Sequence, residues 1–250
     1  LVALDARTLE RWRDQMHDKH GLATANRQLA TVKGALSEAW RRELTDSNVG
    51  ARVSPISGAK VRTRTLDEGE MKALLKAIHA HRDQHFRVAM LWLVTTGARR
   101  GEVLGATWND LQLDPPTRAR WTLPDPKNRE PSVRPIPADL VDEIKRLPRE
   151  SPLVVGHHWG TVRTFATWWV VLRAKAGLPD DITLHDLRRS FGLAATLAGG
   201  LQVAQRLLGH KSIATTARVY SPLSTDDLRE HQDAVVAKIL PFRSKADAEK

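Results

Sequence analysis

The sequence predicts a mainly helical protein that contains one small antiparallel β-sheet. Apolar residues recur at helical spacing through most of the chain, as in the stripe of Leu29, Val32 and Leu36. Only two short segments, residues 120–123 and 133–136, have the composition of strands, and the turn between them predicts an antiparallel hairpin. With 250 residues, 41% of them hydrophobic, the chain can bury the core of one large domain or of two smaller ones.

A loop-like segment divides the chain into two regions. Residues 48–64 are rich in Gly, Ser, Pro and Arg and have no sustained apolar period. The region before this segment has two helical stripes, which make a thin core for an independent domain. We therefore expect part of a helical domain at residues 1–52, a linker at 53–64, a second domain at 65–240 and a C-terminal tail at 241–250.

Capping residues mark the expected ends of the first helices. Asp5 or Thr8 can cap a helix that ends at Gly21, and Thr24 can cap the next one. Thr65 begins the sequence Thr-Leu-Asp-Glu, which has the pattern of a capping box at the start of the second domain.

A tight bend is expected between two buried helices after residue 96. Residues 86–96 are almost entirely apolar, and Gly97 ends their helix. Arg99 and Arg100 follow at once, so helices on both sides hold their backbone. Further along the chain, apolar spacing over residues 162–172 predicts another helix.

The stretch from residue 183 to residue 220 contains the side chains that best suit chemistry. Thr183 can cap a helix on which His185 and Arg188, three residues apart, share one face. Gly199 and Gly200 are expected to end this helix. The apolar residues expected to pack inward are Leu187, Phe191, Ala194 and Ala198 and, on the next helix, Val203, Leu207 and Leu208.

The same stretch ends on the only tyrosine of the chain. Gly209 is expected to stop the second helix at His210, and Ser212 can cap a third that runs towards Tyr220. Each polar residue taken alone has a structural explanation as a helix cap, a surface charge or a half-buried packing residue. Their joint occurrence with the arginines upstream favours a functional site.

Composition favours a polyanionic partner. The net charge of +10 and the isoelectric point near 10.3 are typical of proteins that bind nucleic acid. The chain has no cysteine, which excludes disulfides and thiolate metal sites, and no apolar run long enough to span a membrane. We expect a cytoplasmic protein that binds nucleic acid.

Four motifs, in order along the chain, resemble those of the tyrosine recombinase (phage integrase) family. The resemblance covers residues from about 64 to 220, and residues 1–50 resemble the end of the family's helical core-binding domain. Four motifs in one order are far more specific than any one of them. They read TTGARRGEVLGATWNDL, PKNREPSVRPIP, HDLRRSF and LLGHKSIATTARVY.

The resemblance implies the family's catalytic fold and its DNA strand exchange. By this match Tyr220 is the nucleophile that forms a 3′-phosphotyrosyl bond, although it follows His210 by ten residues where the family usually has nine. Arg99 and Arg188 would clamp the scissile phosphate, because a guanidinium stays charged and bonds two oxygens at once. Lys127 would protonate the departing 5′-oxygen.

The same match assigns supporting roles. His185 and His210 correspond to accessory acid–base and hydrogen-bonding positions, and Glu102 to a position that supports Arg99 or the histidine. No metal and no other cofactor is implied, since the arginines supply the positive charge that magnesium supplies elsewhere.

The partners implied by the resemblance are DNA and further copies of the chain. The two domains would form a C-shaped clamp on duplex DNA. Four copies would exchange strands between two recombination sites through a four-way junction. The C-terminal helix expected at residues 224–239 would dock on a neighbouring protomer. Accessory DNA-bending proteins are compatible with this assignment, and no membrane partner is expected.

Other classes of protein remain as alternatives. A type IB topoisomerase shares the tyrosine chemistry, and a catalytically impaired member of the family would only bind DNA. A non-catalytic DNA-binding protein explains the charge but not the ordered set of candidate residues. A metal-dependent hydrolase would want several carboxylates near its histidines, and Asp186 is the one obvious candidate. The histidines it would use are His157, His158, His185 and His210.

Overall fold

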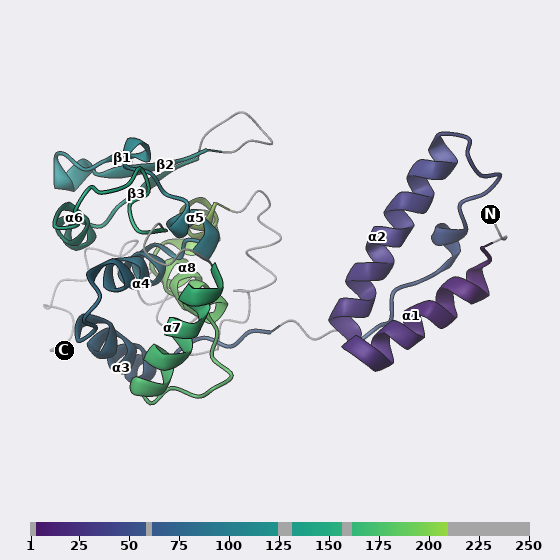
Figure 1. The fold of residues 1–250 in the computed structure, drawn as a ribbon, viewed down its shortest axis with the longest axis horizontal. Coiled ribbons are helices and arrows are strands. Elements are labelled where there is room, and N and C mark those ends of the chain that lie inside the picture. The colour runs from purple at the N-terminus through teal and green to yellow at the C-terminus, as the bar shows by residue number, and fades with distance from the viewer. Residues whose placement is uncertain (1–3, 59–61, 125–131, 157–161, 210–250) are drawn as a thin grey trace, which may run out of the picture. The chain divides into compact units, whose positions relative to one another are not determined.

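A computed structural model describes residues 4–58, 62–124, 132–156 and 162–209 (Figure 1). The chain divides into two compact units, Leu1–Val61 and Arg62–Lys250. The fold is mostly helical with one three-stranded antiparallel sheet, which confirms the predicted class. In the part of the chain that the structure describes, no helix has the length and apolar character needed to cross a membrane.

The first unit is a pair of helices joined by one glycine. Helix α1 spans Ala6–His20, α2 spans Leu22–Arg41, and the short 3-10 helix η1 spans Val49–Arg52. Asp5 caps α1 as predicted, since its carboxylate accepts a hydrogen bond from the Thr8 amide at 2.7 Å. The prediction of a cap at Thr24 is wrong. Gly21 adopts φ 80°, so the chain enters α2 immediately and Thr24 lies inside the helix.

An extended segment packs against the two helices of the first unit. Leu9, Leu29 and Val53 are buried together. Asn26 on α2 exchanges two hydrogen bonds with the backbone of Ile56, at 2.8 and 2.9 Å. Residues 53–56, which the sequence placed in the linker, are thus held against α2.

In its described residues, the second unit contains the sheet and six α-helices. Its helices are α3 (Glu68–His79), α4 (Gln84–Thr96), α5 (Arg100–Leu104), α6 (Ala138–Lys145), α7 (Val162–Lys175) and α8 (Leu184–Leu208). Its strands are β1 (Leu111–Gln112), β2 (Arg120–Leu123) and β3 (Ser132–Pro135), and the 3-10 helices are η2 (Trp108–Asp110) and η3 (Pro116–Arg118).

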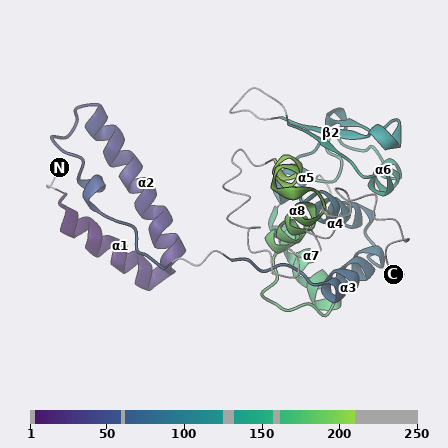
Figure 2. The ribbon, with the colours of Figure 1, turned by 180° about the vertical axis from the view of Figure 1, so that it is seen from behind.

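Helix α4 runs through the core of the second unit. It contacts α3, α5, α6 and α8, and Figures 1 and 2 both show it between α3 and the sheet. The Phe86 ring lies 5.1 Å from the Phe165 ring of α7, and the Trp92 ring lies 4.8 Å edge-on from the Trp121 ring of β2. Because aromatic side chains bury the most area, these two pairs fix α7 and the sheet to α4.

The sheet has the order β1-β2-β3, with both pairs antiparallel. The predicted hairpin is present, with Trp121 opposite Arg134 and Leu123 opposite Ser132. The segment that joins β2 to β3, residues 125–131, lies outside the described residues.

Helix α8 doubles back on itself at Gly200. This residue has φ 81° and ψ 172°, and it separates two helical halves. In a straight helix, residues 188 and 208 would be about 30 Å apart. Instead, the Arg188 guanidinium donates a hydrogen bond to the Leu208 carbonyl at 2.8 Å. The break predicted at Gly199 and Gly200 is therefore real, and Gly209 (φ 64°) ends the second half as expected.

Two details of the helix predictions are wrong. The capping box of α3 is formed by Asp67 and Glu70 rather than at Thr65. The Leu66 amide donates a hydrogen bond to Ser190 Oγ on α8, so residues 65 and 66 lie outside α3 and the helix begins after Asp67. Ala194, Ala198 and Val203 are exposed, and Ala195 and Ala204 take the inward positions. Alanine carries too little apolar area to decide which face of a helix packs inward.

Gly97 is expected to tolerate no side chain. It adopts φ 62°, and an added Cβ would lie 2.9 Å from Leu208 Cδ2 and closer still to Phe191 Cδ1. Gly97→Ala should lower the free energy of unfolding by about 2–4 kcal/mol, from overpacking and left-handed strain together. Urea unfolding measures this loss. Gly101→Ala in α5 is the control, since its Cβ would meet nothing within 4 Å, and a similar loss in both variants would contradict the prediction.

Candidate active site

A cleft of about 550 Å³ in the second unit brings three predicted residues together. Arg99, His185 and Arg188 line it, although 86 residues of sequence separate the first two. Two further arginines, Arg100 and Arg173, also face it. Its apolar wall comes mainly from Trp169, Val170, Ile182 and Leu184.

Arg188 is the buried cation of the cleft, with 4% of its surface exposed. Its Nη1 donates to the Gly97 carbonyl at 2.6 Å and its Nη2 to the Leu208 carbonyl at 2.8 Å. Both carbonyls stand at helix ends, where they have no helical partner. The guanidinium therefore joins the end of α4 to the end of α8.

Arg99 is the exposed cation of the cleft, with 52% of its side chain accessible. Its Nη1 donates to Glu102 Oε1 at 2.7 Å, and its amide donates to Glu102 Oε2 at 2.8 Å. Glu102 thus holds both the backbone and the side chain of Arg99 from one turn further along the chain. Burial raises the pKa of Glu102, but the Arg134 guanidinium and the Arg99 hydrogen bonds lower it more, so the group stays ionised.

Arg134 is a residue of this site that the sequence analysis missed. It is 3% exposed on β3, and its Nη1 donates to Glu102 Oε2 at 3.0 Å. Its guanidinium also packs against Gly209: a Cβ added to that glycine would lie only 2.5 Å from Arg134 Nη2. A strand pattern could have revealed it, because alternation turns Arg134 inward, where a charge needs a carboxylate partner.

His185 lies in the first turn of α8 and keeps contact with solvent. Desolvation of its ring, and then the charges of Arg189 and Arg188, lower its pKa below the ordinary value. A neutral imidazole at pH 7 can accept a proton or share a hydrogen bond, which suits an accessory acid–base group.

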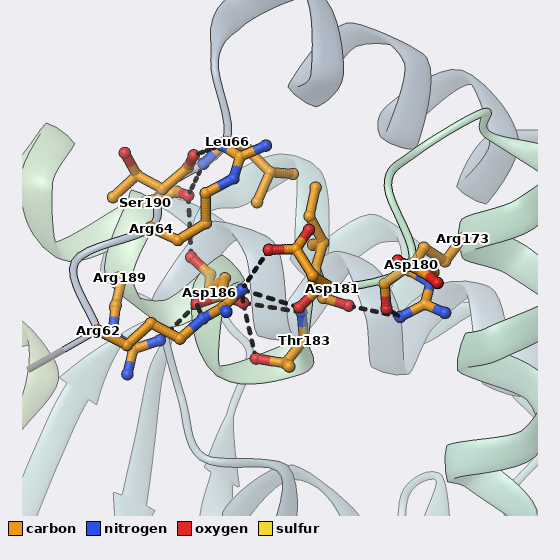
Figure 3. A network of polar contacts seen from close by, with 12 residues as sticks. Arg62, Arg64, Leu66, Arg173, Asp180, Asp181, Thr183, Asp186, Arg189 and Ser190 are labelled. Carbon is orange, nitrogen blue, oxygen red and sulfur yellow. Dashed lines mark hydrogen bonds and ion pairs between the residues drawn. The ribbon is translucent and has the colours of Figure 1, made fainter. Parts of the chain in front are cut away.

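The start of α8 is fixed by a buried acid. Thr183 is the N-cap, as predicted, and its amide and hydroxyl both donate to Asp186 Oδ2 at 2.8 Å (Figure 3). Burial alone would raise the pKa of Asp186, but hydrogen bonds from Arg62 and Thr183 lower it to about 2. A capped first turn gives His185 and Arg188 a defined direction.

Arg173 holds the loop that leads into α8. Its Nη1 donates to the Ile182 carbonyl at 3.0 Å and also to the Asp180 carbonyl (Figure 3). The paired arginines of the ARRGE sequence could have pointed to Arg100, whereas no local pattern marks Arg173.

Three predicted residues lie outside the described residues. Lys127 belongs to the segment between β2 and β3, His210 directly follows Gly209, and Tyr220 comes ten residues later. The predicted helices after Ser212 and at residues 224–239 lie outside as well. Within the described ranges, no three His, Asp or Glu side chains are grouped so that they could hold a metal ion.

The cleft is built to bind an anion beside an apolar wall. Arg99 and Arg188 bring two permanent charges to one opening, and carboxylates and carbonyls behind them fix their direction. Planar guanidinium groups suit phosphate oxygens, which they can bond in pairs. The charge and geometry of this cleft are therefore suited to a phosphate group.

Comparison with known proteins identifies the class. Residues 64–226 match the phage integrase family. The chain belongs to this family, and the curated relatives that it matches include tyrosine recombinases.

Two relatives illustrate the similarity in sequence. The chain is 30% identical over 224 residues to tyrosine recombinase XerD of Corynebacterium glutamicum, with 83% of this chain and 73% of that protein covered. It is 29% identical over 220 residues to tyrosine recombinase XerA of Thermococcus kodakarensis, with 84% and 75% covered.

Solved structures share the fold. One is the XerH site-specific recombinase bound to a palindromic difH substrate, with a TM-score of 0.74 at 18% identity, covering 96% of this chain and 74% of that one. Another is a lambda integrase tetramer bound to a Holliday junction, with a TM-score of 0.67 at 20% identity, covering 89% and 67%.

Loss of Arg134 is expected to destabilise the second unit. Arg134→Met keeps the length of the side chain but removes the charge that compensates Glu102, which should cost about 1–3 kcal/mol of unfolding free energy. The control is Arg146→Met, which breaks the exposed ion pair with Glu143 and should stay within about 0.5 kcal/mol. Equal effects of the two substitutions in urea unfolding would show that Arg134 does not support the site.

Proposed function

We propose that the protein is a site-specific DNA recombinase that cuts and rejoins DNA strands through a 3′-phosphotyrosyl intermediate and a four-way junction. Membership of the tyrosine recombinase family supports this function. The observation that carries it is the cleft itself, where Arg99, His185 and Arg188 meet from two separate motifs. In this proposal the cleft holds the scissile phosphodiester.

The two arginines would act as a clamp on the non-bridging oxygens. Phosphoryl transfer develops negative charge on these oxygens, and the protein accelerates it chiefly by positioning and charge stabilisation. Arg188 has a fixed direction because two carbonyls hold it, and Arg99 is held by Glu102. Donors held in place before the reaction need no reorganisation when charge develops.

Tyr220 and Lys127 would carry the bond changes. The Tyr220 oxygen attacks phosphorus as the bond to the 5′-oxygen breaks, and Lys127 protonates this departing oxygen. The DNA 3′ end is then held as a phosphotyrosyl ester. Attack by a 5′-hydroxyl of a second strand reverses the step, releases Tyr220 and joins the new strands. Both roles come from the family resemblance.

His185 would act on protons near the phosphate. Its lowered pKa leaves it neutral at pH 7, so it can take the Tyr220 proton or hold it through a hydrogen bond. His210 would share this task from the chain that follows Gly209.

The partners in this proposal are duplex DNA and three further copies of the chain. Solved relatives by fold include lambda integrase as a dimer on a core site and as a tetramer on a Holliday junction. Residues 1–52 would belong to a core-binding domain and residues 65–240 to the catalytic domain. Residues 53–64 would join the two, although residues 53–56 pack against α2. A C-terminal segment exchanged between protomers would couple assembly to activity.

A type IB topoisomerase and an inactive DNA-binding member of the family are two alternatives. A topoisomerase would relax supercoiled DNA without a specific site, whereas the proposed recombinase rejoins strands between two matched sites. An inactive member would bind a site and form no adduct.

Tyr220→Phe should bind DNA normally but form no covalent adduct. The substitution removes only the attacking oxygen, and Tyr220 is the single tyrosine of the chain. The measurement is an SDS-resistant protein–DNA band on nicked duplexes, with affinity read by gel shift.

The same assay tests whether Tyr220 is the nucleophile and whether cleavage needs a metal ion. A band that survives in Tyr220→Phe would remove Tyr220 as the nucleophile. Cleavage by the unmodified protein should persist in EDTA, and activity restored by magnesium would favour a metal-dependent hydrolase.

A sulfur substrate should separate the roles of Lys127 and Arg99. Replacing the 5′-bridging oxygen by sulfur makes a leaving group that hardly needs a proton, because a thiol has a much lower pKa than an alcohol. Cleavage by Lys127→Ala should therefore be largely restored. Arg99→Ala should remain slower by about 10²–10³-fold on either substrate, since a lost charge donor is not replaced. Equal restoration of both variants, or none for Lys127→Ala, would exclude Lys127 as the acid.

A further inference from the structure

We infer that Arg62 is a positioning residue of the active site, which sets the direction of His185 and Arg188 by holding the buried carboxylate between them. The inference concerns a residue outside the four family motifs. It rests on the proposed function for its effect on DNA cleavage, but its geometric basis is independent of that function.

Arg62 makes a two-point contact with Asp186. Its Nε donates to Asp186 Oδ1 at 3.1 Å, and its Nη2 donates to Asp186 Oδ2 at 2.9 Å (Figure 3). The same Nη2 lies 2.8 Å from the carbonyl oxygen and 3.2 Å from Oδ2 of Asp181. A planar fork on a carboxylate fixes orientation as well as distance.

Asp186 lies where its orientation can influence that of His185 and Arg188. It is fully buried, and it lies one residue after His185 and two before Arg188. Its other partners are Thr183, which caps α8, and Arg189, which forms an ion pair with it. Without Arg62, the carboxylate would have to turn towards these remaining partners, because a buried charge must stay compensated.

Arg62 is also where the chain enters the second unit. Arg62 is the first residue of this unit. Four residues later the Leu66 amide donates to Ser190 Oγ at 2.8 Å, and that hydroxyl donates to the Asp186 carbonyl at 2.9 Å. Residues 62–66 are thus bound to the first two turns of α8 at both ends. A displacement of the entering chain would reach the turn that carries His185 and Arg188.

Two features distinguish Arg62 from an ordinary surface ion pair. Its side chain is 40% exposed, but its partner Asp186 has no exposed surface. Exposed pairs are worth little because water competes with them, whereas loss of one partner of a buried charge moves its neighbours. A displacement of about 1 Å at a reacting group can cost about 10²-fold in rate.

The first test is single-turnover formation of the covalent adduct at saturating DNA. Arg62→Ala should slow the reaction by roughly 10–100-fold, and Arg62→Lys, which keeps the charge but not the fork, should recover part of the rate. The control is Arg146→Ala, which removes the same charge from a residue that caps the end of α6 and whose side chain is 63% exposed. No residue of α6 lines the cleft. DNA affinity should fall equally in Arg62→Ala and Arg146→Ala, so only the saturated rate separates them.

The second test needs neither DNA nor activity. The His185 ring titration, followed by proton NMR and assigned with His185→Gln, should move to higher pH in Arg62→Ala. The reason is that Arg62→Ala removes one of the cations that balance the charge of Asp186, so the carboxylate favours the charged imidazole of His185 more strongly. Arg146→Ala should leave the titration unchanged. All measurements are made well below the unfolding midpoint of each variant.

The two tests fail separately. If the unmodified protein forms no adduct, the proposed function is wrong and the titration alone decides the inference. An unmoved His185 titration in Arg62→Ala, or a saturated rate equal to that of Arg146→Ala, would show that Arg62 merely tethers the chain.

Discussion

The buried guanidinium of Arg188 is the interaction on which the cleft depends. It is hydrogen-bonded to the last carbonyls of two helix ends, Gly97 after α4 and Leu208 at the close of α8. In the sequence, Arg99 follows two residues after Gly97 and His210 two residues after Leu208. One side chain, that of Arg188, therefore holds together the two helix ends that precede these motifs. A residue of this kind has a double role: the fold requires its charge to be satisfied, and the proposed chemistry uses that same charge.

Acids behind the arginines make this concentration of positive charge stable. Glu102 forms ion pairs with Arg99 and Arg134, and Asp186 forms ion pairs with Arg62 and Arg189. Each carboxylate stays ionised because its cationic neighbours outweigh the effect of burial. The anions fix the direction of the cations without occupying the cleft, where a DNA phosphate would supply the final negative charge.

The sequence predicted the fold class, the hairpin, the breaks at Gly97, Gly200 and Gly209, and three residues that share the cleft. These features depend on local signals: apolar period, glycine conformation and short motifs. It did not predict Arg62, because its partner Asp186 lies 124 residues away and no local pattern marks such a pair. It also missed Arg134, whose partner Glu102 lies 32 residues away, although the alternation of β3 turns that side chain inward. The inward face of α8 was partly wrong for a related reason, since alanines leave the choice of face to tertiary packing. Lys127, His210 and Tyr220 remain predictions.

The doubling back of α8 at Gly200 divides the proposed active site into two pieces of chain. Residues up to 199 carry Arg99, His185 and Arg188, and those after 200 lead to His210 and Tyr220. The turn is exposed, and no neighbouring atom lies within 4 Å of where a Gly200 Cβ would be. Exposed turns of this sort accept chain breaks and insertions. Gly200 is thus a natural point at which to divide the protein into two co-expressed fragments, one holding the proposed phosphate clamp and the other the proposed nucleophile. Strand cleavage would then depend on their reassembly.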